Sequence, residues 1–327
     1  MNTAIKRIGV LTSGGDAPGM NAAIRSVVRA AIFRGIECIG IRRGYSGLIS
    51  GDFIKLDAGS VSHMLNRGGT MLYTARCDAF MTLEGQQKAA ATCKLLGLDG
   101  IVGIGGDGTF RGLLALSKLG VPVVGIPATI DNDIVCTDYT IGYDTAANTA
   151  VEAIDRLRDT MHSHERCSVV EVMGRNAGHL ALYVGLAVGA TSVLVPERNY
   201  DFDTDVMEKI RQARLNGKTH HMIVVAEGAG HAVDVAEQIR ESLMLDPRVT
   251  ILGHIQRGGT PTARDRVMAT RMGFHAVEAL ANGKNNRVIC ARAGSMVDID
   301  ILEGLSMKKG LNQQQYEGLE AMTGIGL

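Results

Sequence analysis

Short apolar runs alternate with longer amphipathic stretches along most of the chain. Between most of the short runs, apolar residues recur at helical spacing, which is the pattern of α/β proteins. Strands that alternate with helices in this way form mostly parallel sheets that helices cover on both faces. The pattern therefore predicts an α/β fold of two doubly wound, mostly parallel-sheet domains. The predicted strands are residues 8–12, 37–41, 101–104, 121–126, 168–172, 193–195, 222–226, 249–252 and 288–290.

Two stretches give the most specific predictions of local structure. A helix is predicted over residues 20–33, because Pro18 precedes it, its apolar residues repeat at helical spacing, and Gly35 can end it. The longest apolar tract, residues 180–195, is shorter than the ~20 residues that span a bilayer, and Thr191 and Ser192 interrupt it. This tract is therefore predicted to be a buried helix followed by a strand.

Composition narrows the class of protein. With 327 residues, 46% of them hydrophobic, the chain can bury a large core and is predicted to form two domains. Because 34 basic residues balance 34 acidic ones, no overall charge would recruit nucleic acid or an anionic membrane, and neither partner is expected. The six cysteines form no C-x-x-C pair, which argues against a zinc site or a disulfide framework. Reduced thiols, and a first predicted strand too near the amino terminus for a signal peptide, favour a cytoplasmic protein.

The chemically informative residues follow predicted strands, where open α/β sheets bind ligands. Residues 105–109 read G-G-D-G-T, so backbone N–H groups can approach a bulky anion while Asp107 can hold a metal ion. Anion and metal together indicate a nucleoside triphosphate. Gly103, Gly105 and Gly108 also satisfy the G-x-G-x-x-G dinucleotide fingerprint, so an NAD-dependent dehydrogenase is an alternative.

Four further loops carry related chemistry. T-S-G-G-D-A-P-G-M-N at 12–21 combines a glycine pair with a helix start, which suits a phosphate or an ordinary tight turn. T-I-D-N-D at 129–133 places two carboxylates and a hydroxyl in one loop, although Asx-turns and helix caps explain many such loops. M-G-R at 173–175 and G-H-I-Q-R-G-G at 253–259 each bring an arginine that can present a planar fork to phosphate oxygens.

Taken in order, these five motifs closely resemble those of bacterial 6-phosphofructokinases. The resemblance runs from about residue 6 to about residue 292. It implies transfer of the ATP γ-phosphoryl group to the 1-hydroxyl of fructose 6-phosphate, the committing step of glycolysis, with Mg²⁺ as cofactor. It also implies a homotetramer. The G-G-D-G-T motif alone would equally suit NAD kinases and diacylglycerol kinases, but the motif at 12–21 argues against them.

The resemblance assigns roles to individual residues. Asp107 is expected to hold Mg²⁺, Asp131 to act as general base, and Arg175 with the Gly15 N–H to stabilise the transferring group, while Thr129 and Asp133 hold the loop and the substrate. The residues expected around ATP are Gly15, Arg76, Cys77, Gly106, Asp107, Gly108 and Thr109. Those expected around the sugar phosphate are Thr129, Asp131, Met173, Gly174, Arg175, Glu227, His254 and Arg257, with Arg166 and Arg248 from a neighbouring subunit.

The same resemblance divides the chain into domains and addresses the phosphoryl donor. We expect an ATP-binding domain of residues 1–142 plus about 256–306, and a sugar and effector domain of 143–255 plus about 307–327.

Pyrophosphate-dependent relatives carry aspartate at the position of Gly108 and lysine at that of Ala128. Glycine leaves space for the α-phosphate of a nucleotide, so ATP is favoured and pyrophosphate is the alternative. A non-catalytic nucleotide or sugar-phosphate sensor is disfavoured because Asp107, Asp131 and Arg175 are all present.

Regulation is where the sequence departs from the family pattern. The bacterial effector site for ADP or phosphoenolpyruvate uses basic residues that match Arg25, Arg29, Arg158, Lys218 and His220. Thr191 stands where family members often carry glutamate, Asn216 where arginine is common, and Thr219 replaces a lysine. Losing a carboxylate and two cations predicts an altered or diminished response to both effectors.

Overall fold

The computed structural model describes residues 5–322, which divide into two compact units. Unit 1 contains the residues up to 129, together with 134–145 and 257–309. Unit 2 contains residues 130–133, 146–256 and those from 310 onward. Residues 1–4 and 323–327, which belong to the domain ranges predicted from sequence, lie outside the described residues.

Unit 1 is built on a seven-stranded sheet of order β11-β10-β5-β4-β1-β2-β3. The five inner strands run parallel, and the two edge strands, β3 and β11, each pair antiparallel with their neighbour. The strand bounds are β1 Arg7–Ser13, β2 Glu37–Ile41, β3 Phe53–Leu56, β4 Gly100–Gly105, β5 Val123–Pro127, β10 Arg287–Arg292 and β11 Ser295–Asp300.

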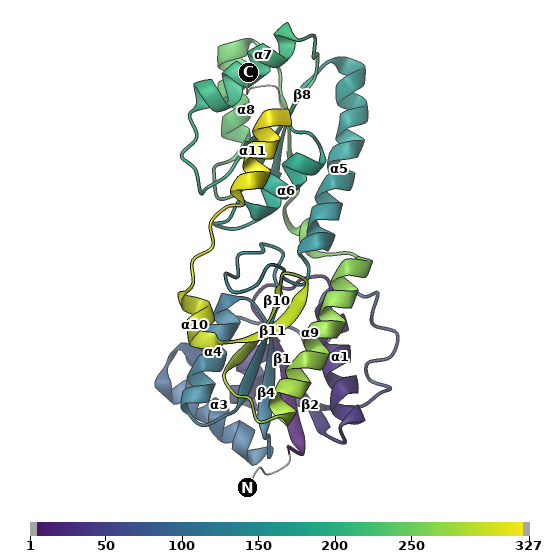
Figure 1. Ribbon diagram of the computed structural model, residues 1–327, viewed down its shortest axis with the longest axis vertical. Coiled ribbons are helices and arrows are strands. Elements are labelled where there is room, and N and C mark those ends of the chain that lie inside the picture. Colours follow the sequence, from purple (N-terminus) through teal and green to yellow (C-terminus); the bar gives the residue numbers. More distant parts are fainter. Residues whose placement is uncertain (1–4, 323–327) are drawn as a thin grey trace. The chain divides into compact units, whose positions relative to one another are not determined.

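Helices cover both faces of this sheet (Figure 1), with α1 and α9 on one side and α3 and α4 on the other. Helices α1 and α9 approach closely, because a Cβ at Gly273 would lie 2.6 Å from the Cβ of Ser26. On the opposite side, Phe110 and Leu113 of α4 are buried in an apolar core cluster of unit 1. The helices are α1 Met20–Phe33, α2 Gly44–Ser50, α3 Leu83–Leu95, α4 Asp107–Lys118, α9 Ala263–Ala281 and α10 Ile301–Ser306, with a 3-10 turn at Asp78–Met81.

Unit 2 is smaller and contains a four-stranded parallel sheet of order β7-β8-β6-β9. The strands are β6 Cys167–Val172, β7 Ser192–Leu194, β8 His221–Ala226 and β9 Arg248–Ile251. The helical segments are α5 Tyr143–His164, whose first residues belong to unit 1, then α6 His179–Ala187, Asp203–Glu208, α7 Lys209–Leu215, α8 Ala232–Leu243, Gly253–Arg257, whose last residue belongs to unit 1, and α11 Gln313–Met322.

The carboxyl-terminal helix α11 packs on α6 of unit 2. Arg198 stacks over the Tyr316 ring, with its guanidinium carbon 4.1 Å from the ring centroid. The Lys209 side chain is only 4% exposed and pairs with Glu320 at 2.6 Å. This helix therefore neutralises a buried cation.

The structure confirms the predicted fold class and all nine predicted strands, with ends that shift by one or two residues. The predicted helix over 20–33 coincides with α1, and the tract 180–195 is a buried helix followed by a strand. The two antiparallel edge strands were missed. Strand β11 is mostly exposed or half-buried, so it carries a weak apolar signal. Within the described residues, no helix is long and apolar enough to cross a membrane.

Candidate functional site

The loops after β1, β4 and β5 leave unit 1 from one row of its sheet. Ser13 at the end of β1 is paired with Gly105 at the end of β4, and Gly105 is paired with Pro127 at the end of β5. Residues distant in sequence therefore begin their loops side by side. These are the glycine-pair loop, the G-G-D-G-T loop and the loop that carries Thr129.

A hydrogen bond from Thr109 links the glycine-pair loop to the G-G-D-G-T loop. The Thr109 hydroxyl donates to the Ser13 carbonyl at 3.0 Å, and the Thr109 carbonyl accepts from the buried Tyr45 hydroxyl at 2.5 Å. A Cβ at Gly105 would lie 2.3 Å from the Ser13 carbonyl oxygen, so only glycine permits this approach. Thr109 is 2% exposed. The structure thus uses Thr109 to hold the loops in place.

The G-G-D-G-T loop leads into the amino terminus of α4, where the space around two of its glycines is open. Asp107 is the first residue of that helix and is half-buried. A Cβ at Gly106 or Gly108 would meet no atom within 4 Å. Helix amino termini attract anions, and a carboxylate oxygen is a good ligand for Mg²⁺. The loop offers both features in one place.

The glycine-pair loop faces an arginine from a distant part of the chain. A Cβ at Gly15 would lie 2.6 Å from Arg257 Nη1, so glycine here makes room for the guanidinium. Arg257 Nη1 also lies 4.0 Å from Asp16 Oδ1. Gly14 and Gly19 adopt positive φ angles of 87° and 106°, which favour glycine. In unit 1, Arg257 therefore lies at a phosphate-type loop.

The segment that leads to Arg76 and Cys77 is fastened beside the same loop. Thr12 donates to the Tyr73 carbonyl at 2.8 Å, and Thr74 donates to the Gly14 carbonyl at 2.5 Å. Arg76 is exposed and Cys77 is half-buried. Their chain neighbours thus border the edge formed by the strand ends of unit 1.

Unit 2 has a comparable edge at the ends of its own strands. Val172 of β6 is paired with Ala226 of β8, and Glu171 of β6 with Ile251 of β9. The loops that begin with Met173, Glu227 and Leu252 therefore start close together. The exposed His254 follows in the third of these loops.

The carboxylate of Glu227 shapes the M-G-R loop. Its Oε1 accepts from the Gly174 N–H at 3.2 Å and from the Arg175 N–H at 2.6 Å. The buried Gln256 accepts from the Met173 N–H at 2.9 Å. Arg175 has φ of 56° and an exposed side chain, so the loop presents its guanidinium to solvent.

The remaining residues predicted for the sugar site lie at several places. Asp131 is 9% exposed and belongs, with the half-buried Asp133, to the part of the T-I-D-N-D loop assigned to unit 2. Thr129 belongs to unit 1, where its carbonyl accepts from the Thr140 hydroxyl at 2.7 Å.

Two arginines expected to serve a neighbouring subunit lie in unit 2. Arg166 is half-buried just before β6, where its carbonyl accepts from the His221 N–H. Arg248 begins β9 and is exposed, with Asp246 3.1 Å away. Neither lies in the loops that follow β6 and β8.

The sequence of this chain is similar to those of known phosphofructokinases. A phosphofructokinase family model matches residues 7–280. The chain is 52% identical over 313 residues to the ATP-dependent 6-phosphofructokinase of Clostridium botulinum strain Hall, covering 96% of this chain and 98% of that protein. It is 54% identical over 312 residues to the enzyme of the same name from Bacillus pumilus, covering 95% and 98%. This chain belongs to the phosphofructokinase family.

Solved structures agree with that membership. Pichia pastoris phosphofructokinase in the T-state is 34% identical with a TM-score of 0.89, and the match covers 99% of this chain but 37% of that longer one. A pyrophosphate-dependent phosphofructokinase from Marinobacter aquaeolei has a TM-score of 0.85 at 20% identity, over 98% of this chain and 92% of that one, which shows the shared fold.

In this phosphofructokinase, the predicted effector residues occur in two groups. Arg25 and Arg29 lie one turn apart on α1 of unit 1; burial and the neighbouring Arg29 lower the pKa of Arg25. The other group, in unit 2, consists of Arg158, Lys218 and His220.

The unit 2 group is a cluster of basic side chains. Residue 191 beside them is a threonine, so it supplies no carboxylate. Burial, and then the charge of Arg158, lowers the pKa of Lys218. Burial and the charges of Lys218, His162 and Arg158 lower the pKa of His220. Lys218 Nζ lies 3.4 Å from the hydroxyl of the buried Thr191, a neutral partner.

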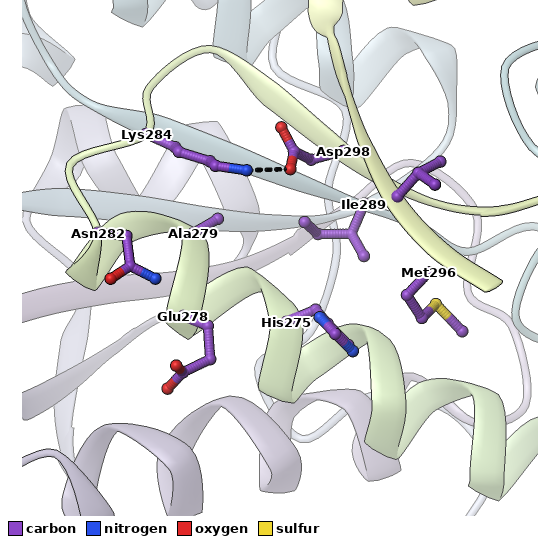
Figure 2. A pocket seen from close by; sticks show the side chains of 9 residues that line it. His275, Glu278, Ala279, Asn282, Lys284, Ile289, Met296 and Asp298 are labelled. Atoms are coloured by element: carbon purple, nitrogen blue, oxygen red, sulfur yellow. Dashed lines mark hydrogen bonds and ion pairs between the residues drawn. The ribbon is translucent and has the colours of Figure 1, made fainter.

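A polar pocket of about 150 Å³ lies elsewhere on unit 1, between α9 and the β10–β11 hairpin (Figure 2). Figure 2 shows Lys284 and Asp298 in an ion pair at its rim. Its lining contains none of the residues predicted for ATP, sugar or effector. The lining residues are His275, Glu278, Ala279, Asn282, Lys284, Ile289, Met296, Val297 and Asp298.

Sequence reasoning missed several residues that organise these loops. Gln256, Tyr45 and Asp265 are buried and bond to loop or helix-start atoms. Only Asp265 has a sequence signal, because Thr262 followed three residues later by an acid is a helix-start pattern. Gln256 lies within the motif at 253–259, which gives no role to its amide, and Tyr45 lies in α2 outside every motif.

Proposed function

We propose that this chain is an ATP-dependent 6-phosphofructokinase that transfers the γ-phosphoryl group of ATP to the 1-hydroxyl of fructose 6-phosphate. The observation that carries the proposal is the row formed by Ser13, Gly105 and Pro127, which brings three phosphate-type or carboxylate loops to one sheet edge. The names of its curated relatives support the choice of substrates. Because the reaction is a step of glycolysis, we also propose that the enzyme acts in the cytoplasm.

Unit 1 is proposed to bind ATP. Loop N–H groups at Gly15 and Gly106 and the amino terminus of α4 would contact the phosphates, and Arg76 and Cys77 would border the nucleotide. Asp107 fits Mg²⁺, because a half-buried carboxylate stands beside the open space over Gly106 and Gly108. When bound, Mg²⁺ would supply positive charge to the phosphates.

Space at the loop supports ATP rather than pyrophosphate as the donor. A side chain at Gly108 would project into the volume where the rest of a nucleotide must pass, and that volume is open. Ala128 is buried beneath the loop with 1% exposure, so a lysine there would have to leave the core. Gly108 therefore favours the larger donor, and Ala128 is not the lysine of pyrophosphate-dependent relatives.

Unit 2 is proposed to hold fructose 6-phosphate. Glu227 keeps the M-G-R loop in shape, so that Met173 and Gly174 border the sugar and Arg175 offers its guanidinium to the transferring phosphoryl group. His254 of unit 2 and Arg257 of unit 1 are further proposed sugar-phosphate residues. Arg166 and Arg248 are proposed to act in a neighbouring subunit of a homotetramer.

Catalysis would consist mainly of positioning and charge neutralisation, as expected for a loose phosphoryl-transfer transition state. Asp131 would accept the proton of the sugar 1-hydroxyl as that oxygen attacks the γ-phosphorus. Thr129 and Asp133 would keep its loop and the sugar in place.

A coupled assay with fructose 6-phosphate tests the proposal. Wild-type protein should form fructose 1,6-bisphosphate with ATP and not with pyrophosphate, and Asp131→Ser should lower kcat by about two or more orders of magnitude with little change in sugar affinity. Turnover with pyrophosphate alone would reassign the donor. An Asp131→Ser enzyme of nearly full activity would remove Asp131 from the base role.

Regulation by ADP or phosphoenolpyruvate is proposed to be weakened. The effector cations of unit 2 meet a neutral Thr191 hydroxyl where a glutamate is common in the family. Saturation curves for fructose 6-phosphate, measured with and without each effector, should shift less than twofold. Large activation by ADP together with strong inhibition by phosphoenolpyruvate would contradict the proposal.

A further inference from the structure

Two buried thiols face each other in unit 1, among residues that no step above uses. Cys136 Sγ and Cys290 Sγ lie 3.5 Å apart. Cys136 is 1% exposed and lies in the segment after the T-I-D-N-D loop, whereas Cys290 is fully buried in β10. Both belong to the apolar core cluster of unit 1 that also contains Phe110 and Leu113. Sulfur atoms this close need only a short displacement to bond.

Hydrogen bonds hold the two chain segments alongside each other. The Asp138 N–H donates to the Ala291 carbonyl at 2.9 Å, and the Ala291 N–H donates to the Thr137 hydroxyl at 3.0 Å. Arg292 Nε donates to the Cys136 carbonyl at 3.0 Å. These hydrogen bonds fix the two backbone segments next to each other. The short distance between the two thiols therefore does not depend on side-chain rotamers alone.

The two thiols differ in chemical character. The Cys290 S–H donates to Cys136 Sγ, which lowers the pKa of Cys136 and raises the pKa of Cys290. The charge of Arg292 also favours a thiolate at Cys136, whereas burial and the charge of Asp107 oppose it. The thiolate is the nucleophile in thiol oxidation, and Cys136 lies directly under the short helix α10, against Gly304. Cys136 is therefore assigned as the sulfur that reacts first and Cys290 as the resolving thiol.

We propose that Cys136 and Cys290 form a reversible dithiol–disulfide pair that hydrogen peroxide oxidises. The Cys136 thiolate attacks one peroxide oxygen, giving Cys136 sulfenic acid and hydroxide, and the O–O bond breaks. Cys290 sulfur then attacks the Cys136 sulfur; the S–O bond breaks, and the departing hydroxide takes the Cys290 proton as water. The two sulfurs lose two electrons and peroxide gains them. An added dithiol reverses the reaction by thiol–disulfide exchange.

Access to the pair requires local opening of a short element. Gly304 of α10 covers Cys136, since a Cβ at Gly304 would lie 3.2 Å from Cys136 Sγ. Helix α10 has only six residues, and its Leu302 is 60% exposed. Short surface elements open far more often than a whole domain unfolds. Opening of α10 therefore sets the rate of oxidation.

Bond formation would move the segment that follows the proposed catalytic loop. A disulfide has an S–S distance of about 2.05 Å, so the two sulfurs must approach by roughly 1.5 Å. Cys136 follows Asp131 by only five residues. Because a displacement of about 1 Å in a catalytic group can cost 100-fold, kcat of the oxidised enzyme should fall at least about tenfold.

The test uses the full-length reduced enzyme, treated with hydrogen peroxide, quenched, denatured and alkylated. The alkylation count should fall from the six cysteines of the chain to four, and peptide mapping should find Cys136 linked to Cys290. Dithiothreitol should restore six thiols and the original kcat. The thiol count is independent of the enzymatic activity, so it remains valid whatever the enzyme phosphorylates.

Two variants sharpen the result. Cys290→Ala removes both the resolving thiol and the S–H donor to Cys136, so Cys136 should oxidise more slowly and stop at the sulfenic acid, which dimedone traps. Cys167→Ala removes another buried strand cysteine and should still give the Cys136–Cys290 link. Six alkylatable thiols after treatment, a link between other cysteines, or sulfinic acid at Cys136 in the wild type would overturn the pair. A linked enzyme with unchanged kcat would overturn its effect on turnover.

Discussion

The buried carboxylate of Asp265 is a sharp target for a stability measurement. It is fully buried, and each of its oxygens accepts two hydrogen bonds. Oδ1 accepts from the Tyr139 hydroxyl at 2.6 Å and the Gly142 N–H at 2.7 Å. Oδ2 accepts from the Thr145 N–H at 2.9 Å and from the Thr145 hydroxyl. A single side chain thus satisfies four donors in unit 1.

The carboxylate also serves two helix starts at once. Asp265 lies in the first turn of α9, where its own N–H donates to the Thr262 hydroxyl at 3.3 Å. Gly142 and Thr145 lie at the beginning of α5, and the Thr262 N–H donates to the Thr145 hydroxyl at 3.0 Å. A negative charge placed there interacts favourably with both helix dipoles.

Replacing Asp265 by asparagine turns one of the two acceptor oxygens into a donor. On either oxygen the hydroxyl partner can rotate to accept instead, but the backbone N–H cannot, so one buried N–H loses its acceptor. That loss costs about 1–3 kcal/mol, and losing charge at two helix starts adds about 1 kcal/mol. Burial raises the pKa of Asp265, so the neutral amide recovers part of the desolvation cost. The net destabilisation should be about 2 kcal/mol.

Thermal unfolding followed by circular dichroism measures the effect, with an expected decrease in Tm of about 5 °C. Asp234→Asn is the matched control, because Asp234 lies in the first turn of α8 at the same position from the helix start but is exposed. It should lower Tm by less than about 1 °C. Equal shifts for the two variants would refute the argument from burial and leave only the helix dipole.

Two further predictions concern buried titratable side chains of unit 2. Burial, followed by the charges of nearby cations, lowers the pKa of His221 to about 4, so its neutral form stabilises the fold above pH 6.5 and that stabilisation is lost as the pH falls toward 4. Between pH 7 and pH 5, the unfolding free energy of His221→Phe should therefore fall by about 2 kcal/mol less than that of the wild type. Urea titration at both pH values measures this difference, and an unchanged pH dependence would contradict it. Glu320→Gln leaves the buried Lys209 ammonium without its carboxylate and should lower the urea midpoint by the equivalent of about 2 kcal/mol. The control Glu317→Gln changes an exposed residue of the same helix and should have no measurable effect; equal midpoints for the two variants would argue against the ion pair.

The parts of the fold that could be predicted are those where local pattern and tertiary environment agree. The inner strands are buried on both faces, so they are continuous apolar runs in sequence, and α1 has both a start and a stop signal. Strands β3 and β11 lie at sheet edges and are partly exposed. Their sequences carry too little apolar signal to separate them from loops.

The phosphate-type loops could be predicted because parallel strands bring their carboxyl ends to one edge, which makes residues 13, 105 and 127 neighbours whatever their separation in sequence. The roles within the loops were harder to predict. Thr109 belongs to a nucleotide motif in sequence, yet its side chain is buried and bonds to the neighbouring loop. Motif membership identifies the loop; exposure decides which of its residues can contact a ligand.

The least predictable features are contacts between residues far apart in sequence that share no motif. Cys136 and Cys290 are separated by 154 positions, and in sequence each is one more isolated cysteine. The two sulfur atoms come close only because β10 pairs with β5 and because the segment after Asp133 runs beside the end of β10. Both conditions depend on strand order, which short apolar runs do not encode. Strand order in unit 1 thus determines both the arrangement of the phosphate loops and the reactivity of a thiol pair beside them.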